Sequence, residues 1–203
     1  LKRNGLLQFV ASLKLNHGMQ MESLLLQEKL KAWLIEDHLR KDILAAVAEL
    51  GLSQGMVAAG FVRNLVWDKL HNFERTELND VDLIWHNVSE ADPEIDRDLE
   101  ARLRGLMPEV KWSVKNQARM HLRNGHKPYR DCADAMSFWP ELETAVAVTP
   151  SMDLVTPFDL ELLFALTVTR NPKASLGLFH QRVMSKDWLN RWERLTVVEE
   201  YIE

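Results

Sequence analysis

Two aspartates, Asp80 and Asp82, stand one residue apart in the run Asp80-Val81-Asp82-Leu83-Ile84-Trp85. The start of this run alternates polar and apolar residues, which is typical of a β-strand, and alternate strand residues project from one face. Two like charges on one face raise each other's pKa unless a cation lies between them. Paired carboxylates suit Mg²⁺ or Mn²⁺, which keep some waters and accept phosphate oxygens as further ligands. The spacing predicts a metal site for a phosphate-bearing substrate, whereas an isolated pair of this kind also occurs at solvated strand ends.

A glycine precedes this pair by one predicted helix. The short apolar run 56–59 predicts a buried strand that ends at Gly60, and residues 61–71 predict a helix with an apolar face. Because glycine has no Cβ, the backbone at such a turn can approach a phosphate, and the helix that follows offers free N–H groups. A strand, a glycine, a helix and then Asp-x-Asp on the next strand form a more specific order than either feature alone.

Four stretches of the chain resemble a known family. They are AAGFVRNLVWDKLHNFERTELNDVDLIW (58–85), WSVKNQARMHLRNGHKPY (112–129), FWPELETAVAV (138–148) and TPFDLELLF (156–164). Together they resemble a bacterial family of predicted nucleotidyltransferases, formerly of unknown function, within the polymerase-β-like superfamily. The resemblance spans about residues 25–195. It implies an α+β fold, in which a mixed sheet of four or five strands is flanked by helices and preceded by an N-terminal helix pair.

The resemblance also implies an activity and the residues that carry it. The expected activity is metal-dependent transfer of a nucleoside monophosphate from an NTP to an unknown acceptor, which can be a small molecule, a protein or RNA. Asp80 and Asp82 match the catalytic, metal-binding pair for Mg²⁺ or Mn²⁺. Gly60 matches the first of two small residues that hold the triphosphate, and Phe61 stands in place of the second, so that phosphate binding also draws on Arg63 and Asn64.

The third carboxylate of the superfamily, which activates the attacking hydroxyl, has no clean match. If residues 110–115 are the strand expected to carry it, the nearest candidate is Asn116, which cannot act as a base. Asp153 and Glu143 are weaker candidates. Three readings therefore stay open. The protein is an enzyme, a noncatalytic nucleotide-binding or regulatory module, or an interaction scaffold that binds neither metal nor nucleotide.

Charge is segregated along the middle of the chain. Residues 77–100 hold nine acids and one base, whereas residues 111–130 hold six bases and no acid. Asp92 is expected as a helix N-cap before Pro93, with Glu94 and Asp96 in the first turn, where the helix dipole favours them. The basic stretch either pairs with this acidic helix or neutralises the phosphates of a substrate through some of its side chains, namely Lys115, Arg119, His121 and Lys127, with Asn116 nearby.

Composition limits the partners. The chain has 203 residues, 46% hydrophobic and 27% charged, as in globular proteins, and its formal net charge of −5 argues against general DNA binding or an anionic membrane surface. The one cysteine, Cys132, excludes an intrachain disulfide and favours a reducing, cytoplasmic location. No apolar run is long enough to span a membrane.

The elements that position these residues can be outlined from the same patterns. Residues 1–20 are expected to be a leader or an appended segment, and 21–203 a single domain. Residues 22–50 predict two amphipathic helices that are broken near 35–37, with Asp37 as an N-cap and Gly51 as the stop. Further strands are expected at 144–148 and 152–155, a helix from Pro157 to about 166, and a closing helical region at 175–195.

Overall fold

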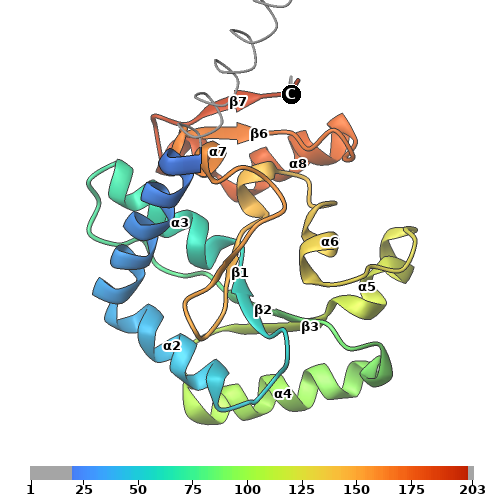
Figure 1. The fold of residues 1–203 in the computed structure, drawn as a ribbon. Coiled ribbons are helices and arrows are strands. Elements are labelled where there is room, and N and C mark those ends of the chain that lie inside the picture. The colour runs from blue at the N-terminus through green and yellow to red at the C-terminus, as the bar shows by residue number, and fades with distance from the viewer. Residues whose placement is uncertain (1–19, 201–203) are drawn as a thin grey trace, which may run out of the picture.

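The computed structural model describes residues 20–200, which begin with two helices (Figure 1). A helix over residues 20–36 leads into α2 (His38–Ala48), whose N-cap Asp37 accepts a hydrogen bond from the Arg40 N–H. Gly51 follows α2 with a φ of +66°. The predicted helix pair and its break at Asp37 are confirmed. Residues 1–19 of the expected leader lie outside the described residues, and the division into a leader and one domain stays a prediction.

The centre of the fold is a mixed five-stranded sheet, as expected. Its order is β3-β2-β1-β4-β5; β2 and β3 are parallel, and the other neighbours are antiparallel. The strands are β1 (Met56–Ala58), β2 (Val81–Trp85), β3 (Trp112–Asn116), β4 (Ala147–Val148) and β5 (Leu154–Val155). In register, Asp82 lies opposite Ala58 of β1 on one side and Ser113 of β3 on the other.

The two faces of the sheet have different coverings. Val57, Leu83 and Val114 point to a face that packs on the N-terminal helices, on α3 (Gly60–Leu70) and on α4 (Pro93–Leu106), which form the main core. Figure 1 shows these helices together on one side of the sheet. The opposite face carries Asp82 and Ser113, because strand side chains alternate. It is covered only in part, by α5 (Gln117–Asn124), α6 (Cys132–Met136) and the segment that follows α6.

The crossover from β2 to β3 matches the sequence pattern. After the 3-10 turn η1 (Val88–Glu90), Asp92 caps α4 by accepting a hydrogen bond from the Glu94 N–H, and Pro93 is the first helical residue. The predicted cap and start of this helix are confirmed. α4 thus provides the crossover connection that the parallel pair of β2 and β3 needs.

The last third of the chain departs from the expected elements. The strand predicted at 144–148 is shortened to β4 by the 3-10 turn η2 (Leu142–Thr144). The helix predicted from Pro157 begins later, as α7 (Leu160–Phe164), because the Thr156 hydroxyl bonds the Phe158 N–H in a local turn. The closing region contains the expected helices and also a parallel strand pair that was not predicted. These elements are β6 (Thr167–Thr169), α8 (Leu176–Lys186), α9 (Trp188–Arg191) and β7 (Thr196–Val198).

Two tryptophans of this closing region, Trp188 and Trp192, belong to the interior. Trp188 and Trp192 make edge contacts with Trp67 of α3, with ring centroids 5.8 and 5.1 Å apart. These contacts attach the C-terminal elements to the helix that begins at Gly60. Among residues 20–200, no helix is both long and apolar enough to cross a membrane.

Candidate active site

The turn from β1 to α3 forms one side of the candidate site. Ala59 has φ 57° and ψ −121°, a conformation that disfavours any residue with a Cβ, and its N–H donates to the Val146 carbonyl at 2.9 Å. The bend thus falls one residue before Gly60, which was expected to make it. Gly60 begins the helix, and a Cβ built there would meet Asn64 Nδ2 at 3.5 Å and Arg63 Nη2 at 3.6 Å. Gly60, Arg63 and Asn64 therefore lie together at the helix start.

Asp82 lies directly beside this turn, on the partly covered face of the sheet. Burial raises the pKa of its carboxyl above the usual range, and the negative charge of Asp80 raises that pKa further. A hydrogen bond with Ser113 and the positive charges of Lys186 and Arg63 act in the opposite direction. The two aspartates thus lie near enough to repel each other, and a cation bound between them would relieve that repulsion.

Arg63 is the cation buried behind the turn. Its side chain is 5% exposed, and it donates from Nη1 to Thr144 Oγ1 at 2.7 Å and from Nη2 to Asn64 Oδ1 at 2.9 Å. The guanidinium also lies over the rings of Trp67 and Trp188, 4.9 and 4.5 Å from their centroids. Burial lowers the pKa of Arg63 to about 10, so that it stays charged at neutral pH.

A cavity of about 400 Å³ opens in front of Asp82. Its floor consists of the side chains that alternate along β2 and β3, and its walls come from the β1–α3 turn, α5, the segment after α6, and α8. The lining residues are Ala59, Asp82, Ile84, Ser113, Lys115, Gln117, Met120, Arg123, Asn124, Trp139, Pro140, Thr144 and Arg182. The carboxylate of Asp82 thus meets a space that has cationic and amide side chains on several sides.

Comparison with known proteins identifies the family. A family model described as nucleotidyltransferase matches residues 45–197, which include the turn, both aspartates and the whole cavity lining. The chain belongs to the nucleotidyltransferase family. The predicted family membership is confirmed.

A solved structure supports this assignment and the fold. An NMR structure described as revealing a CCA-adding enzyme head domain is similar to this chain, with a TM-score of 0.75 and 28% sequence identity. The match covers 85% of this chain and 96% of that one. Among curated proteins, no match was found.

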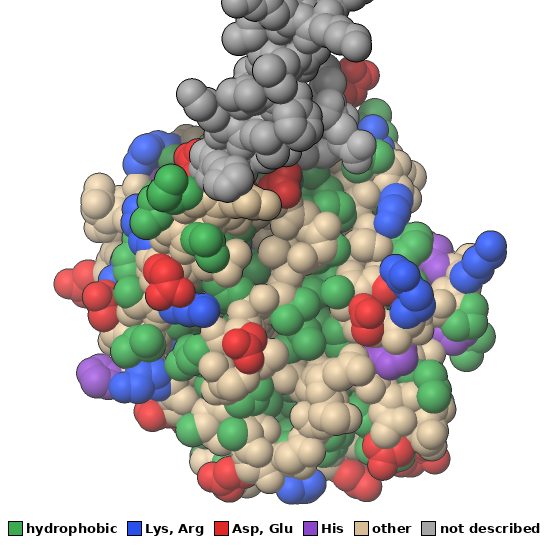
Figure 2. Space-filling model, viewed as in Figure 1, with side chains coloured by type: hydrophobic (Ala, Val, Ile, Leu, Met, Phe, Trp, Pro, Cys, Tyr) green, Lys and Arg blue, Asp and Glu red, His purple; other side chains and the backbone are tan. Residues whose placement is uncertain are grey.

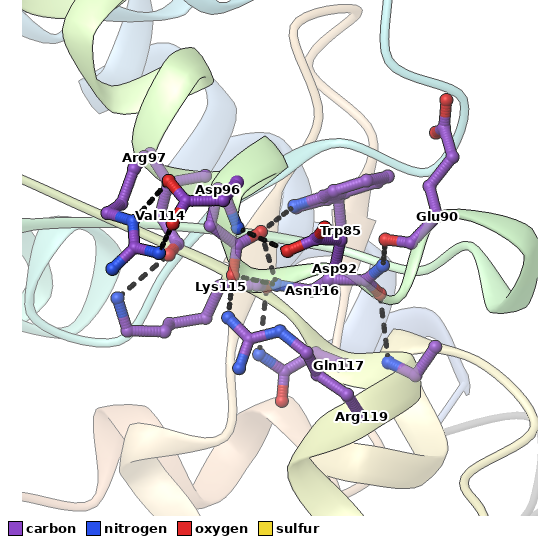
Figure 3. A network of polar contacts seen from close by, with 12 residues as sticks. Trp85, Glu90, Asp92, Asp96, Arg97, Val114, Lys115, Asn116, Gln117 and Arg119 are labelled. Carbon is purple, nitrogen blue, oxygen red and sulfur yellow. Dashed lines mark hydrogen bonds and ion pairs between the residues drawn. The ribbon is translucent and has the colours of Figure 1, made fainter.

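Asn116 has a structural place in this nucleotidyltransferase fold. It is fully buried, its side chain accepts from the Ala118 N–H as the cap of α5, and its Nδ2 donates to the Asn87 and Glu90 carbonyls at 2.8 Å. Figure 3 shows this side chain among protein groups, where it ties the end of β3 to the loop after β2. The structure therefore does not bring the Asn116 side chain to the cavity.

The carboxylate of Asp96 completes the network that holds α5. It accepts hydrogen bonds from Trp85 Nε1 at 2.9 Å and from the Asn116 N–H at 3.0 and 3.1 Å, and it forms an ion pair with Arg119 (Figure 3). Asp96 is 3% exposed, whereas its place in the first turn of α4 predicts only a dipole-favoured acid. The alternative expectation for the basic stretch, pairing with the acidic helix, holds for Arg119.

Of the remaining predicted phosphate-binding residues, Lys115 lines the cavity, and Phe61 and Lys127 do not. Lys115 lines the cavity and donates to the Val114 carbonyl at 2.9 Å. The side chain of Phe61 is fully buried in the main core, so that only its backbone faces the turn. Lys127 is exposed on the loop after α5 and is not part of the cavity lining.

Within residues 20–200, no third carboxylate joins the pair. Glu143 is buried and bonds the Thr167 hydroxyl and the Thr169 N–H, and burial raises its pKa. Asp153 is exposed in the β4–β5 turn, where it bonds Ser151, toward the end of β1 away from Asp82. Across residues 20–200, no cluster of three or more Asp, Glu, His or Cys side chains is arranged to hold a metal ion. The position opposite Asp82 on β3 is occupied by Ser113.

The structure adds residues that the sequence patterns did not indicate. Thr144 and Arg182 reach the cavity from segments about 80 and 120 residues after the turn, and Arg182 is held by a paired contact with the buried Glu141, with Nε to Oε1 at 2.6 Å. Only Ser113 had a local signal, since it precedes Lys115 by two residues on a predicted strand. The others depend on tertiary packing.

Proposed function

We propose that this protein transfers a nucleoside monophosphate from an NTP to an acceptor, with a divalent metal ion held by Asp80 and Asp82. The observation that carries the proposal is the register position of Asp82. It lies beside a tight strand-to-helix turn and the buried cation Arg63, and it faces the cavity. Family membership and the likeness to a CCA-adding enzyme head domain support an NTP as the donor.

The donor set fits Mg²⁺ or Mn²⁺. Both ions prefer oxygen ligands, and Mg²⁺ is commonly held by one or two carboxylates together with substrate phosphates. Burial and the charge of Asp80 raise the pKa of Asp82 in spite of Ser113, Lys186 and Arg63, and a bound cation would act with these three groups to favour the charged carboxylate. The metal, when bound, neutralises charge that develops on the phosphates.

The phosphates of the donor would contact the turn. The first N–H groups of α3, an 11-residue helix, lack partners within the helix and lie at the positive end of its dipole. Arg63 and Asn64 lie over Gly60, next to Ala59, which lines the cavity, and Arg182 lines the cavity from α8. We leave out the side chains of Phe61 and Asn116, which are buried among protein groups, and Lys127, which is exposed on the loop after α5.

The transfer itself is a displacement at the α-phosphorus. A bond forms between an acceptor oxygen and this phosphorus, the bond to the oxygen that bridges the α- and β-phosphates breaks, and pyrophosphate leaves. The proton of the acceptor hydroxyl passes to water or to a group of the acceptor, because no carboxylate lies opposite Asp82. This chain contributes positioning of both reactants and stabilisation of the phosphate charge.

A noncatalytic nucleotide-binding module is the second candidate. The observation that favours it is Ser113, which stands opposite Asp82 and cannot replace the third carboxylate as a base. This reading predicts nucleotide binding that depends on Mg²⁺, without release of pyrophosphate.

One experiment separates the two. The protein is incubated with Mg²⁺ and each α-labelled NTP, together with a panel of small-molecule, protein and RNA acceptors, and both pyrophosphate release and nucleotide binding are measured. Asp82→Asn is expected to lower the rate by roughly 10³-fold, since it removes a metal ligand and charge stabilisation together. Asp98→Asn is the matched control, because Asp98 is an exposed aspartate on α4.

The outcomes are distinct. Release that is lost in Asp82→Asn and kept in Asp98→Asn supports the transferase. Mg²⁺-dependent binding without release by wild type supports the module. Absence of both defeats the two candidates and leaves the interaction scaffold.

A further inference from the structure

We infer that the part of the cavity bounded by β3 and α5 receives an acceptor that carries a phosphate group. This inference rests on the proposed function and names the class of its second substrate. The first step is the order of the strands. Within the sheet, Ala58 and Ser113 lie on opposite sides of Asp82. The β1–α3 turn and β3 therefore approach Asp82 from opposite directions.

The geometry of phosphoryl transfer assigns a reactant to each direction. The attacking and leaving oxygens lie roughly in line on opposite sides of the phosphorus. When the leaving pyrophosphate contacts the turn and Arg63, the attacking oxygen arrives from the side of β3. The wall on that side is α5, which follows β3 directly.

Charge on that wall indicates what it receives. Lys115 and Arg123 line the cavity there, and within residues 20–200 neither takes part in an ion pair. Their basic neighbours Arg119 and Arg130 are paired, with Asp96 and Asp134. Figure 2 shows Lys, Arg and His side chains gathered over α5 and the loop after it. Lys115 and Arg123 therefore give this wall positive charge that no ion pair within residues 20–200 neutralises.

The amount and placement of this charge fit a phosphate group. A phosphomonoester carries a charge of about −1.5 to −2 at neutral pH, which two cations match. The wall is also held in place, because the Asp96 network anchors the start of α5 to β3 and α4 (Figure 3). A general nucleic-acid surface is not implied, since the formal net charge of the chain is −5.

The test is calorimetric and uses the whole chain. Wild type is loaded with Mg²⁺ and a nonhydrolysable ATP analogue to fill the donor side, and inorganic phosphate is then titrated as the smallest probe. We expect phosphate to bind without displacing the analogue, and Lys115→Gln/Arg123→Gln to weaken phosphate binding at least about tenfold, because two charge-assisted hydrogen bonds are lost. The matched control Lys41→Gln/Arg102→Gln removes two exposed cations from α2 and α4 and should bind phosphate as wild type does.

Two further titrations identify the source of the phosphate group. Glycerol 3-phosphate represents a small phosphomonoester, and a hexaribonucleotide represents a nucleic-acid backbone; the tighter ligand in wild type names the source, and both should weaken in Lys115→Gln/Arg123→Gln. Phosphate that binds the loaded protein equally in this variant and in wild type, or that binds only by displacing the analogue, overturns the inference. Failure of the proposed function looks different, since wild type then either does not bind the nucleotide in the presence of Mg²⁺ or binds it without releasing pyrophosphate in the assay with acceptors, and the inference falls with it.

Discussion

Asp82 and Asp96 both place a carboxylate inside the fold, and the chain surrounds them in opposite ways. Asp96 accepts hydrogen bonds from Trp85 and the Asn116 backbone and pairs with Arg119. Asp82 has a hydrogen bond with Ser113 and a second acid, Asp80, close enough to raise its pKa. One carboxylate is thus satisfied by protein groups, and the other is left with capacity for a ligand.

The difference teaches where stability and function lie in this fold. A buried charge that is fully hydrogen-bonded ties elements together, whereas a carboxylate with a raised pKa in a cavity is a candidate for chemistry. The Asp96 network joins α4 to β2, β3 and α5, and the last three form the floor and one wall of the cavity. Asp82 lies in that cavity, and its buried charge lowers the stability of the metal-free protein.

The largest expected effect concerns Asp96, the carboxylate that is fully hydrogen-bonded within the protein. Asp96→Ala should lower the free energy of unfolding by about 3–5 kcal/mol, because it leaves Arg119 buried without its partner and Trp85 Nε1 without an acceptor. Urea unfolding followed by circular dichroism measures it. Asp98→Ala, on the exposed face of the same helix, should change stability by less than about 0.5 kcal/mol. Equal losses in the two variants would show that the network does not hold α5.

A second variant adds a carboxylate next to Asp82, so that the protein depends more on a bound cation for its stability. Ser113→Asp places a third carboxylate opposite Asp82, which should destabilise the metal-free protein and increase the affinity for Mg²⁺ about tenfold, since each added charged ligand tightens such a site. Thermal unfolding at a series of Mg²⁺ concentrations reports both effects. Ser113→Asn controls for size without charge. Stabilisation of both variants by Mg²⁺ to the same extent would argue against metal binding at this pair.

Local sequence patterns predicted several features of these two regions. The alternation around Asp80 and Asp82 predicted a strand, which the structure has as β2 with Asp82 in it and Asp80 directly before it, and Asp37, Asp92 and Pro93 marked helix starts that the structure confirms. These features depend on residues a few positions apart. The mixed sheet, which depends on long-range pairing, was predicted from the family resemblance.

The burial of Asp96 and the residues of the cavity walls could not be predicted from local patterns. Asp96 reads as an exposed first-turn acid, and only the packing of α4 on β3 buries it. Thr144 lies in the segment that follows α6, and Arg182 lies on α8. Both side chains reach the cavity because these two parts of the chain pack near α3. The bend at Ala59 was expected at Gly60, since glycine is the residue that most readily adopts a positive φ.

The turn beside Asp82 carries a conformational cost that the Asp96 network lacks. Ala59→Gly should stabilise the protein by about 1 kcal/mol, because it relieves a conformation that costs Ala about 1–3 kcal/mol and adds some entropy to the unfolded chain. Urea unfolding measures the gain. Ala58→Gly is the matched control on β1 and should destabilise by about 1 kcal/mol. A loss of stability in Ala59→Gly would mean that the alanine methyl group packs favourably at the bend.

The smallest expected effect concerns Asp82 itself and depends on pH. Its pKa is raised in the folded protein, so that the folded state binds the proton more tightly than the unfolded state does. Wild type should therefore lose stability as the pH rises through this raised pKa, and Asp82→Asn, which cannot ionise, should not show that loss. The variant should be the more stable protein at neutral pH, and the difference should shrink as the pH falls through the folded pKa.

Urea unfolding of both proteins from pH 4 to pH 8 without divalent metal measures this difference, in which the titration of all other groups cancels to first order. Mg²⁺ should reduce the advantage of the variant, because it binds wild type at the carboxylate that the variant lacks. An advantage that stays constant across the pH range would mean that the Asp82 carboxylate is compensated within the protein, as that of Asp96 is. The contrast between the two regions would then be lost, and with it the argument that Asp82 is left for a ligand.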